Sequence, residues 1–126
     1  MKNFEYMEEL PSRCPPEDAI QKEMVVYRAV TSFPPSEADF YSQRRMFPKK
    51  PFNIDDCLAH ACSVFDNEFD IKKKKKLLSH NGIRIVKFKI ELEDGKVKKT
   101  FSKGHHSWWI CKSCHISSKS YEEINE

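Results

Sequence analysis

The sequence predicts an α+β fold, in which a small, mainly antiparallel sheet packs against about three short helices. In residues 84–92 apolar side chains alternate with charged ones, a period of two that is typical of a half-buried strand. Asp94-Gly95 is a tight-turn signal, which predicts that residues 96–101 return as the antiparallel partner. Residues 24–30 are β-branched and apolar apart from one arginine, which indicates a largely buried strand.

The other elements follow from shorter patterns. The five expected strands lie near residues 24–30, 62–65, 83–92, 96–101 and 106–111. Three helices are expected, each behind a capping signal. The signals are the capping box Ser36–Asp39 for residues 36–46, Asn53 or Asp55 for residues 56–61, and Asp66 for residues 66–78. The third helix is expected to end at Asn81-Gly82, and residues 16–22 to form a short helical turn.

Length and charge indicate one domain, because 126 residues are too few for two. We divide the domain into an N-terminal arm at 1–23, a core at 24–111 and an acidic tail at 112–126. The net charge is −3 over residues 1–20 and −2 over residues 116–126, which leaves +8 for the residues between them. Such a basic middle favours polyanions, acidic ends that fold back over it, or plain solubilising charge.

The cytoplasm is the expected location. No apolar run approaches the length of a membrane span, and the first residues do not form a secretory signal. No contact with a membrane is therefore expected. Five cysteines, an odd number, without an export signal predict reduced thiols rather than a disulfide framework.

Polar and aromatic residues beside the predicted strands indicate a binding pocket. Arg28 interrupts an apolar strand, so its guanidinium needs either an acidic partner or a bound anion. Ser63 begins another strand, and its hydroxyl can face the same cleft. In residues 105–109 two imidazoles can close the cleft, and an indole ring can form a flat wall. The expected ligand-binding residues are Arg28, Ser63, His105, His106, Trp108 and Trp109.

The register of the last expected strand can also be predicted. A strand at 106–110 places His106, Trp108 and Ile110 on one face, and Ser107 and Trp109 on the other. Because Ile110 belongs in a core, we expect Trp108 to be buried. Trp109 is expected to lie under the acidic tail or a helix.

Two further motifs have simple interpretations. The lysine run 72–76 can bind phosphates without specificity, but it also suits a solvated surface helix. Cys111-Lys112-Ser113-Cys114-His115 fits the pattern of haem attachment, which requires export, or half of a zinc site, which lacks a second cysteine pair. No metal is therefore expected, and these thiols are predicted to be reduced and partly buried.

The order of the motifs resembles that of a group of small bacterial proteins without an established activity. The resemblance spans about residues 25–110, and the matching motifs are Tyr27-Arg28, Pro34-Pro35, Asp39-Phe40, residues 56–65 and residues 104–109. More remotely, Arg28 in the first strand and Ser63 in a strand after a helix resemble the layout of ADP-ribosyltransferase-like folds. That resemblance implies that Arg28 holds a phosphate of NAD and that Ser63 braces the nicotinamide pocket. The catalytic glutamate of those enzymes has no clear match here, so an inactive relative is as plausible as an enzyme.

The resulting expectation is a cytoplasmic ligand-binding domain of ADP-ribosyltransferase-like layout. NAD or ADP-ribose is the expected ligand, no resident cofactor is expected, and no catalytic residue is assigned. One alternative is a nucleic-acid-binding module that uses the lysine run together with Arg44, Arg45, Lys49 and Lys50. Another is a protein-binding accessory factor of a phage or defence system.

Overall fold

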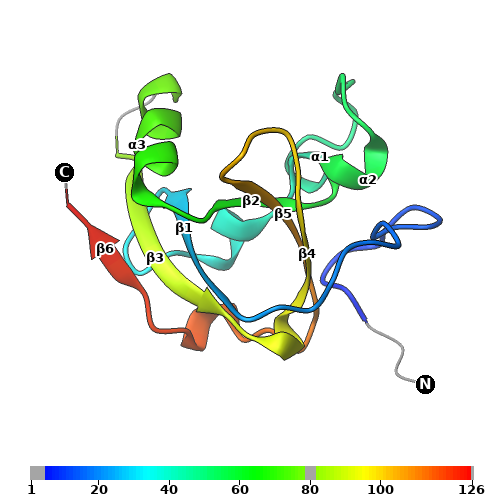
Figure 1. The fold of residues 1–126 in the computed structure, drawn as a ribbon. Coiled ribbons are helices and arrows are strands. Elements are labelled where there is room, and N and C mark those ends of the chain that lie inside the picture. The colour runs from blue at the N-terminus through cyan, green and yellow to red at the C-terminus, as the bar shows by residue number, and fades with distance from the viewer. Residues whose placement is uncertain (1–4, 79–81, 126) are drawn as a thin grey trace.

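Residues 5–78 and 82–125, the part that the computed structural model describes, form a six-stranded antiparallel sheet with short helices around it (Figure 1). The strands are β1 (Met24–Val30), β2 (Cys62–Phe65), β3 (Arg84–Ile90), β4 (Gly95–Lys99), β5 (His105–Ile110) and β6 (Glu122–Ile124). They are hydrogen-bonded in the order β4-β5-β2-β1-β3-β6. The predicted α+β class and antiparallel sheet are confirmed, and each of the five predicted strands forms.

The helices are α1 (Gln43–Met46), α2 (Asp56–Ala59) and α3 (Glu68–Leu77), with 3-10 turns η1 (Glu37–Phe40), η2 (Leu92–Asp94) and η3 (Ile116–Ser118). The helix predicted at 36–46 is divided, because Ser42 starts a new turn by accepting a hydrogen bond from the Arg45 amide at 3.1 Å. Asp55 caps α2, as one of the two predicted alternatives.

The predicted start of the third helix is wrong. Asn67 rather than Asp66 caps α3, because the Asn67 Oδ1 atom accepts the Asp70 amide at 2.8 Å. Of the helical turn predicted at residues 16–22, a single turn forms, in which the Ala19 amide donates to the Pro16 carbonyl at 3.0 Å, and Ile20 then pairs with Val97 of β4 through two backbone hydrogen bonds. The third helix was expected to end at Asn81-Gly82, and of these two residues Asn81 lies outside the described residues.

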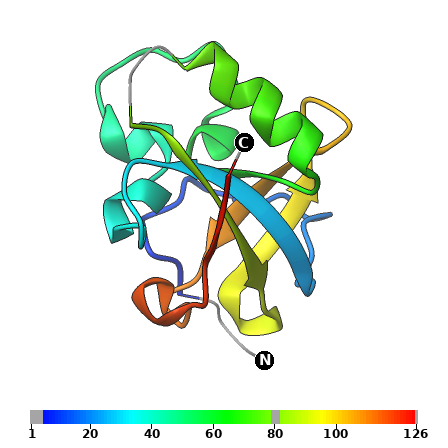
Figure 2. The ribbon, with the colours of Figure 1, turned by 90° about the vertical axis from the view of Figure 1, so that its left-hand side faces the viewer.

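The segment predicted as an acidic tail is part of the fold. β6 pairs with β3 at the edge of the sheet, where it is drawn in red (Figure 2). Ile116 is buried in the main core, and the Lys119 Nζ atom is 2.5 Å from Asp94 Oδ2, an ion pair that is almost fully buried. The negative charge of residues 112–126 did not indicate this packing. It takes no account of the apolar side chains of the segment, which pack against the cores of the sheet: Cys114, Ile116, Tyr121 and Ile124.

The two faces of the sheet carry different cores. Face A, which includes Val64 and Trp108, carries the main core: Val26, Val30, Phe40, Cys62, Val64, Val86, Phe88, Ile90, Val97, Trp108, Ile110, Cys114 and Ile116. Face B carries two smaller clusters, one around Trp109 and one in which Phe65 packs against Ile71 of α3. Along β2 and β5, Ser63 lies between these two clusters, because it pairs with Ser107 while Phe65 pairs with His105.

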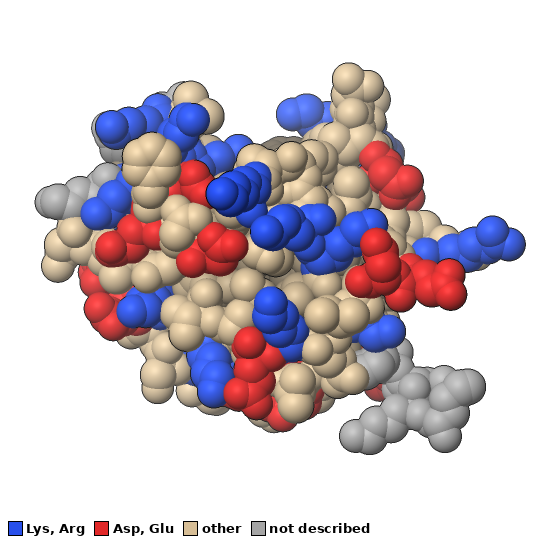
Figure 3. Space-filling view, in the orientation of Figure 1, with Lys and Arg blue, Asp and Glu red and all other residues tan. Residues whose placement is uncertain are grey.

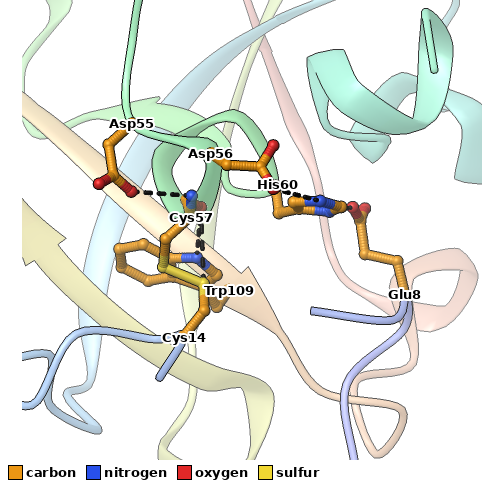
Figure 4. Close-up of a disulfide and its surroundings, with 7 residues drawn as sticks. All are labelled: Glu8, Cys14, Asp55, Asp56, Cys57, His60 and Trp109. Carbon is orange, nitrogen blue, oxygen red and sulfur yellow. Dashed lines mark hydrogen bonds and ion pairs between the residues drawn. A yellow bond between two sulfur atoms is a disulfide. The ribbon is translucent and has the colours of Figure 1, made fainter. Parts of the chain in front are cut away.

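The N-terminal arm is fastened over one end of face B (Figure 4). A disulfide joins Cys14 of the arm to Cys57 of α2, and the Glu8 carboxylate lies 2.7 Å from His60 Nδ1. The prediction of reduced thiols is therefore wrong for this pair, which the fold brings together across 43 positions of sequence. The other three cysteines, Cys62, Cys111 and Cys114, are free and buried.

Candidate functional site

A pocket of about 470 Å³ opens on face B. Its floor is formed by Ser63, Phe65 and His105, one wall by Asp70, Lys73, Lys74 and Leu77 of α3, and the rest by Gln43, Ile54, Leu58, Ala61, Phe101 and Ser102. In Figure 1, α3 and the α1–α2 region rise on opposite sides, and the loop between β4 and β5 lies between them. The pocket lies between the two apolar clusters of face B, which cover the two ends of that face and leave its middle, around Ser63, open. Its volume is within the range of small-ligand sites.

At the floor of the pocket, Ser63 and His105 belong to one hydrogen-bonded chain. The Ser63 Oγ atom is 2.9 Å from His105 Nε2, and His105 Nδ1 is 3.1 Å from the Thr100 carbonyl oxygen. The Thr100 hydroxyl lies 3.1 Å from the same nitrogen and 2.7 Å from the Ser107 hydroxyl. One side of the imidazole is thus held by β2 and the other by the loop that follows β4.

The protonation state of His105 follows from these contacts. Burial lowers the pKa of His105 below its ordinary 6.5, against a smaller opposing effect of the Thr100 carbonyl. The ring is therefore neutral at pH 7 and carries one N–H. The Thr100 carbonyl oxygen can only accept, so the tautomer that satisfies it carries the N–H on Nδ1. The lone pair on Nε2 then accepts the Ser63 hydroxyl proton.

Aromatic rings fix the imidazole from both sides. Phe65 and Phe101 each lie 5.1 Å from His105 between ring centroids, in edge-on arrangements. Phe101 has a φ of 60°, in the left-handed region that residues other than glycine rarely adopt, and this residue of the pocket lining is 65 % exposed. Strained residues of this kind concentrate at functional sites.

Gly104 brings the β4–β5 loop against α3. A Cβ at this position would lie 2.0 Å from Asp70 Oδ2 and 2.6 Å from Asn67 Nδ2, so any other residue here would require these two side chains to move. The Gly104 carbonyl also accepts the Asp66 amide at 3.0 Å. These contacts set His105, the next residue, beneath the first turn of α3.

Arg28 is held by the protein's own backbone. Its guanidinium donates two hydrogen bonds to the Asp39 carbonyl, at 2.9 and 2.7 Å, and one to the Ser63 carbonyl at 2.5 Å. It also lies over the Phe40 ring, on face A. β1 and β2 are paired only at Tyr27 and Phe65, and Arg28 links the two strands where that pairing ends. Arg28 therefore positions the Ser63 backbone from behind the pocket and does not line it.

The structure also separates the residues expected in the 105–109 run. His106 points to face A, where its Nδ1 atom is 3.9 Å from Asp66 Oδ2 and, among the described residues, has no hydrogen-bond partner. Trp108 is 0 % exposed and Trp109 is 1 % exposed, so neither offers a surface to a ligand. The predicted register of the strand is confirmed. Trp109 lies under α2 and the N-terminal arm rather than under the acidic tail.

Of the six expected ligand-binding residues, the structure brings Ser63 and His105 together in the pocket. Sequence reasoning missed Thr100, Phe101, Lys73 and Lys74 as members of the same site. No sequence pattern around Thr100 and Phe101 indicates that the loop containing them folds back onto His105. The two lysines were noticed only as part of a charge run.

The cysteines near the C-terminus do not form a metal centre with their neighbours. The described residues contain no group of three or more His, Cys, Asp or Glu side chains arranged to hold a metal ion. Burial, with a smaller effect of Asp94, raises the pKa of Cys111 to about 11 and that of Cys114 to about 12. Both therefore stay protonated at neutral pH, a poor state for metal binding.

Comparisons with known proteins give no match: no protein-family model, no curated protein and no solved structure is similar to this chain. None of the helices formed by the described residues has the length and apolar character needed to cross a membrane.

Proposed function

We propose that this chain is a cytoplasmic ligand-binding domain whose face B pocket takes a small nucleotide-type anion. The observation that carries the proposal is that the pocket combines two exposed lysines of α3, Lys73 and Lys74, with aromatic walls and a hydrogen-bonding floor. A phosphate group is bound by the two ammonium groups, while a flat ring lies against Phe101. NAD and ADP-ribose carry both parts and are the first ligands to test.

The proposal assigns the phosphate to the lysines rather than to Arg28. Three of the five N–H groups of Arg28 already donate to backbone carbonyls, and its side chain is on the opposite face of the sheet. An ADP-ribosyltransferase-like placement of the phosphate on Arg28 would require these bonds to break. In the α3 pocket, phosphate binding requires no such loss.

Isothermal titration with AMP, NAD and ADP-ribose tests the proposal. The charge-reversal variant Lys73→Glu/Lys74→Glu should weaken binding by roughly tenfold or more for each lysine, as expected for charge-assisted hydrogen bonds. The matched control is Lys72→Glu/Lys76→Glu, which makes the same charge change on the same helix away from the pocket lining. Equal loss in both variants, or no heat with any of the three ligands at millimolar concentration, would refute the proposal.

The same pair of variants distinguishes the nucleic-acid alternative. On the face shown in Figure 3, lysines and arginines are interleaved with acidic side chains rather than gathered into one basic strip. A nucleic-acid-binding module would lose affinity for an oligonucleotide equally in both variants, and its binding would weaken steeply with salt. Pocket binding predicts an effect of the Lys73/Lys74 change alone.

A further inference from the structure

We propose that Ser63 is a nucleophile activated by His105, and that the face B pocket hydrolyses an ester of a small phosphate-bearing alcohol. The inference rests on the proposed function for the anionic part of the substrate. It adds a covalent reaction at the floor of the pocket, which ligand binding alone does not require.

The geometry meets the requirements of an activated serine. The Ser63 Oγ atom is 2.9 Å from His105 Nε2, within the distance at which a base can take its proton. The Thr100 carbonyl accepts from His105 Nδ1 at 3.1 Å, which fixes the tautomer that leaves Nε2 free to accept. Nucleophile, base and orienting group thus follow one another as they do in catalytic triads, with a backbone carbonyl as the third member.

The surroundings keep this arrangement rigid and accessible. Ser63 and His105 lie on adjacent central strands, and Phe65 and Phe101 hold the ring edge-on. Arg28 anchors the Ser63 carbonyl from the other face. Ser63 and His105 both line the pocket, so a substrate can reach the hydroxyl. A serine and a histidine bonded only for structural reasons would not need an open pocket above them.

The reaction balances with water as its only co-reactant. The Ser63 hydroxyl proton passes to His105 Nε2 while Oγ forms a bond to the acyl carbon, whose carbonyl oxygen becomes an oxyanion. The bond from the acyl carbon to the alcohol oxygen then breaks, and that oxygen takes the proton from Nε2. Water then attacks the acyl-serine in the same way. A proton of the water passes to His105 Nε2 while the water oxygen bonds to the acyl carbon. The bond from the acyl carbon to Ser63 Oγ breaks, and Oγ takes the proton back from Nε2. The products are an alcohol and a carboxylic acid, and nothing is oxidised or reduced.

The pocket lining indicates how the ester is oriented. Lys73 and Lys74 bind the phosphate of the alcohol part, and the apolar side chains of Leu58 and Phe65 receive the acyl part. The positive charge of Lys74 also reaches His105, where it adds to the larger effects of burial and of His106 in lowering the pKa of the imidazole.

Labelling with a fluorophosphonate probe, which reacts covalently with activated serines, tests the inference. Intact-mass and peptide analysis should find one adduct, on Ser63. Ser63→Ala should abolish labelling, and His105→Gln should slow it by about 100-fold or more, the usual contribution of a general base. Ser32→Ala, in an exposed loop, is the control and should label like the wild type. p-Nitrophenyl acetate hydrolysis should follow the same order.

The pH dependence provides a readout that a structural role would not change. Labelling should slow as the pH falls through the pKa of His105, which lies below 6.5. The charged groups that act on this imidazole are His106, Lys74 and Arg28, and Asp70 lines the same pocket. A wild-type rate in His105→Gln, or an adduct on a serine other than Ser63, would overturn the inference.

Failure of this inference can be told apart from failure of the proposed function. Nucleotide binding without any labelling of folded wild-type protein would overturn the nucleophile and leave the ligand-binding proposal in place. Labelling of Ser63 without nucleotide binding would overturn the proposed ligand and support the nucleophile.

Discussion

Loss of the Cys14–Cys57 disulfide should destabilise the protein strongly while leaving its native structure intact. The crosslink closes a loop across 43 positions, and the chain-entropy relation gives about 4 kcal/mol of stabilisation for a loop of this length. This contribution acts on the unfolded chain, which the crosslink makes more compact. The native arm retains its other attachments, namely the Glu8–His60 contact and the packing of Tyr6 and Leu10 around Trp109.

Urea denaturation followed by tryptophan fluorescence measures the effect. Cys14→Ser/Cys57→Ser should lower the free energy of unfolding by about 4 kcal/mol and raise the m-value, because its unfolded chain exposes more surface. The native emission maximum should not change, since Trp109 keeps its cover. Wild type with a phosphine reductant should behave as the variant does, and the variant itself should not respond to the reductant.

A thiol count provides an independent check. In the denatured, unreduced wild type, three thiols should react, corresponding to Cys62, Cys111 and Cys114. Reaction of all five, or a stability loss below about 1 kcal/mol on reduction, would show that the two cysteines are not joined and that the arm is held by packing alone.

Three further predictions follow from burial and close contact. Trp108→Ala should cost about 3–5 kcal/mol in urea denaturation, because the indole is completely buried in the main core. Gly95→Ala should cost roughly 3 kcal/mol or more in the same assay, because φ is +133° and the new Cβ would lie 2.0 Å from the Trp109 carbonyl oxygen. Burial lowers the pKa of His105 and of His106 below 6.5, so the unfolded state binds protons first as the pH falls. Their contribution to stability is complete above pH 6.5 and is lost below it, and a His105→Gln/His106→Gln variant should show a smaller loss between pH 7.5 and 5.5.

The sheet could be predicted from the sequence because its signals are local. The alternation in residues 84–92 needs no partner to be recognised, and the same is true of the turn at Asp94-Gly95 and the apolar run at 24–30. Helix ends were predicted less well, because several polar residues near each helix start can act as the cap. Asn67 caps α3 where Asp66 was expected, and Ser42 starts a new turn inside the helix predicted at 36–46.

The candidate site could be predicted only in part, because it depends on contacts between distant segments. Ser63 and His105 are separated by 42 positions, and only the pairing of β2 with β5 brings them to 2.9 Å. Arg28 was expected to need an acidic partner or a bound anion. Its partners are carbonyl groups, however, which every residue carries, so no sequence pattern could have indicated them. The adjacent His105 and His106 were grouped by proximity, but neighbours in a strand point to opposite faces.

The division of the sheet into two faces explains why the pocket lies where it does. Face A carries the main core, to which η1 contributes Phe40 and the C-terminal segment contributes Cys114 and Ile116, and its strands contribute mainly apolar side chains. Face B receives α3 over one small apolar cluster, and α2 together with the N-terminal arm over another. The middle of face B therefore had no apolar cover available, and the sequence places Ser63, Ser107 and His105 there instead of valine or isoleucine. Three polar residues on two central strands are costly to bury unless they bond one another, as these do through Thr100. A core would be more stable with apolar residues at these positions, so their presence beneath an open pocket is the feature of this fold that most needs a function.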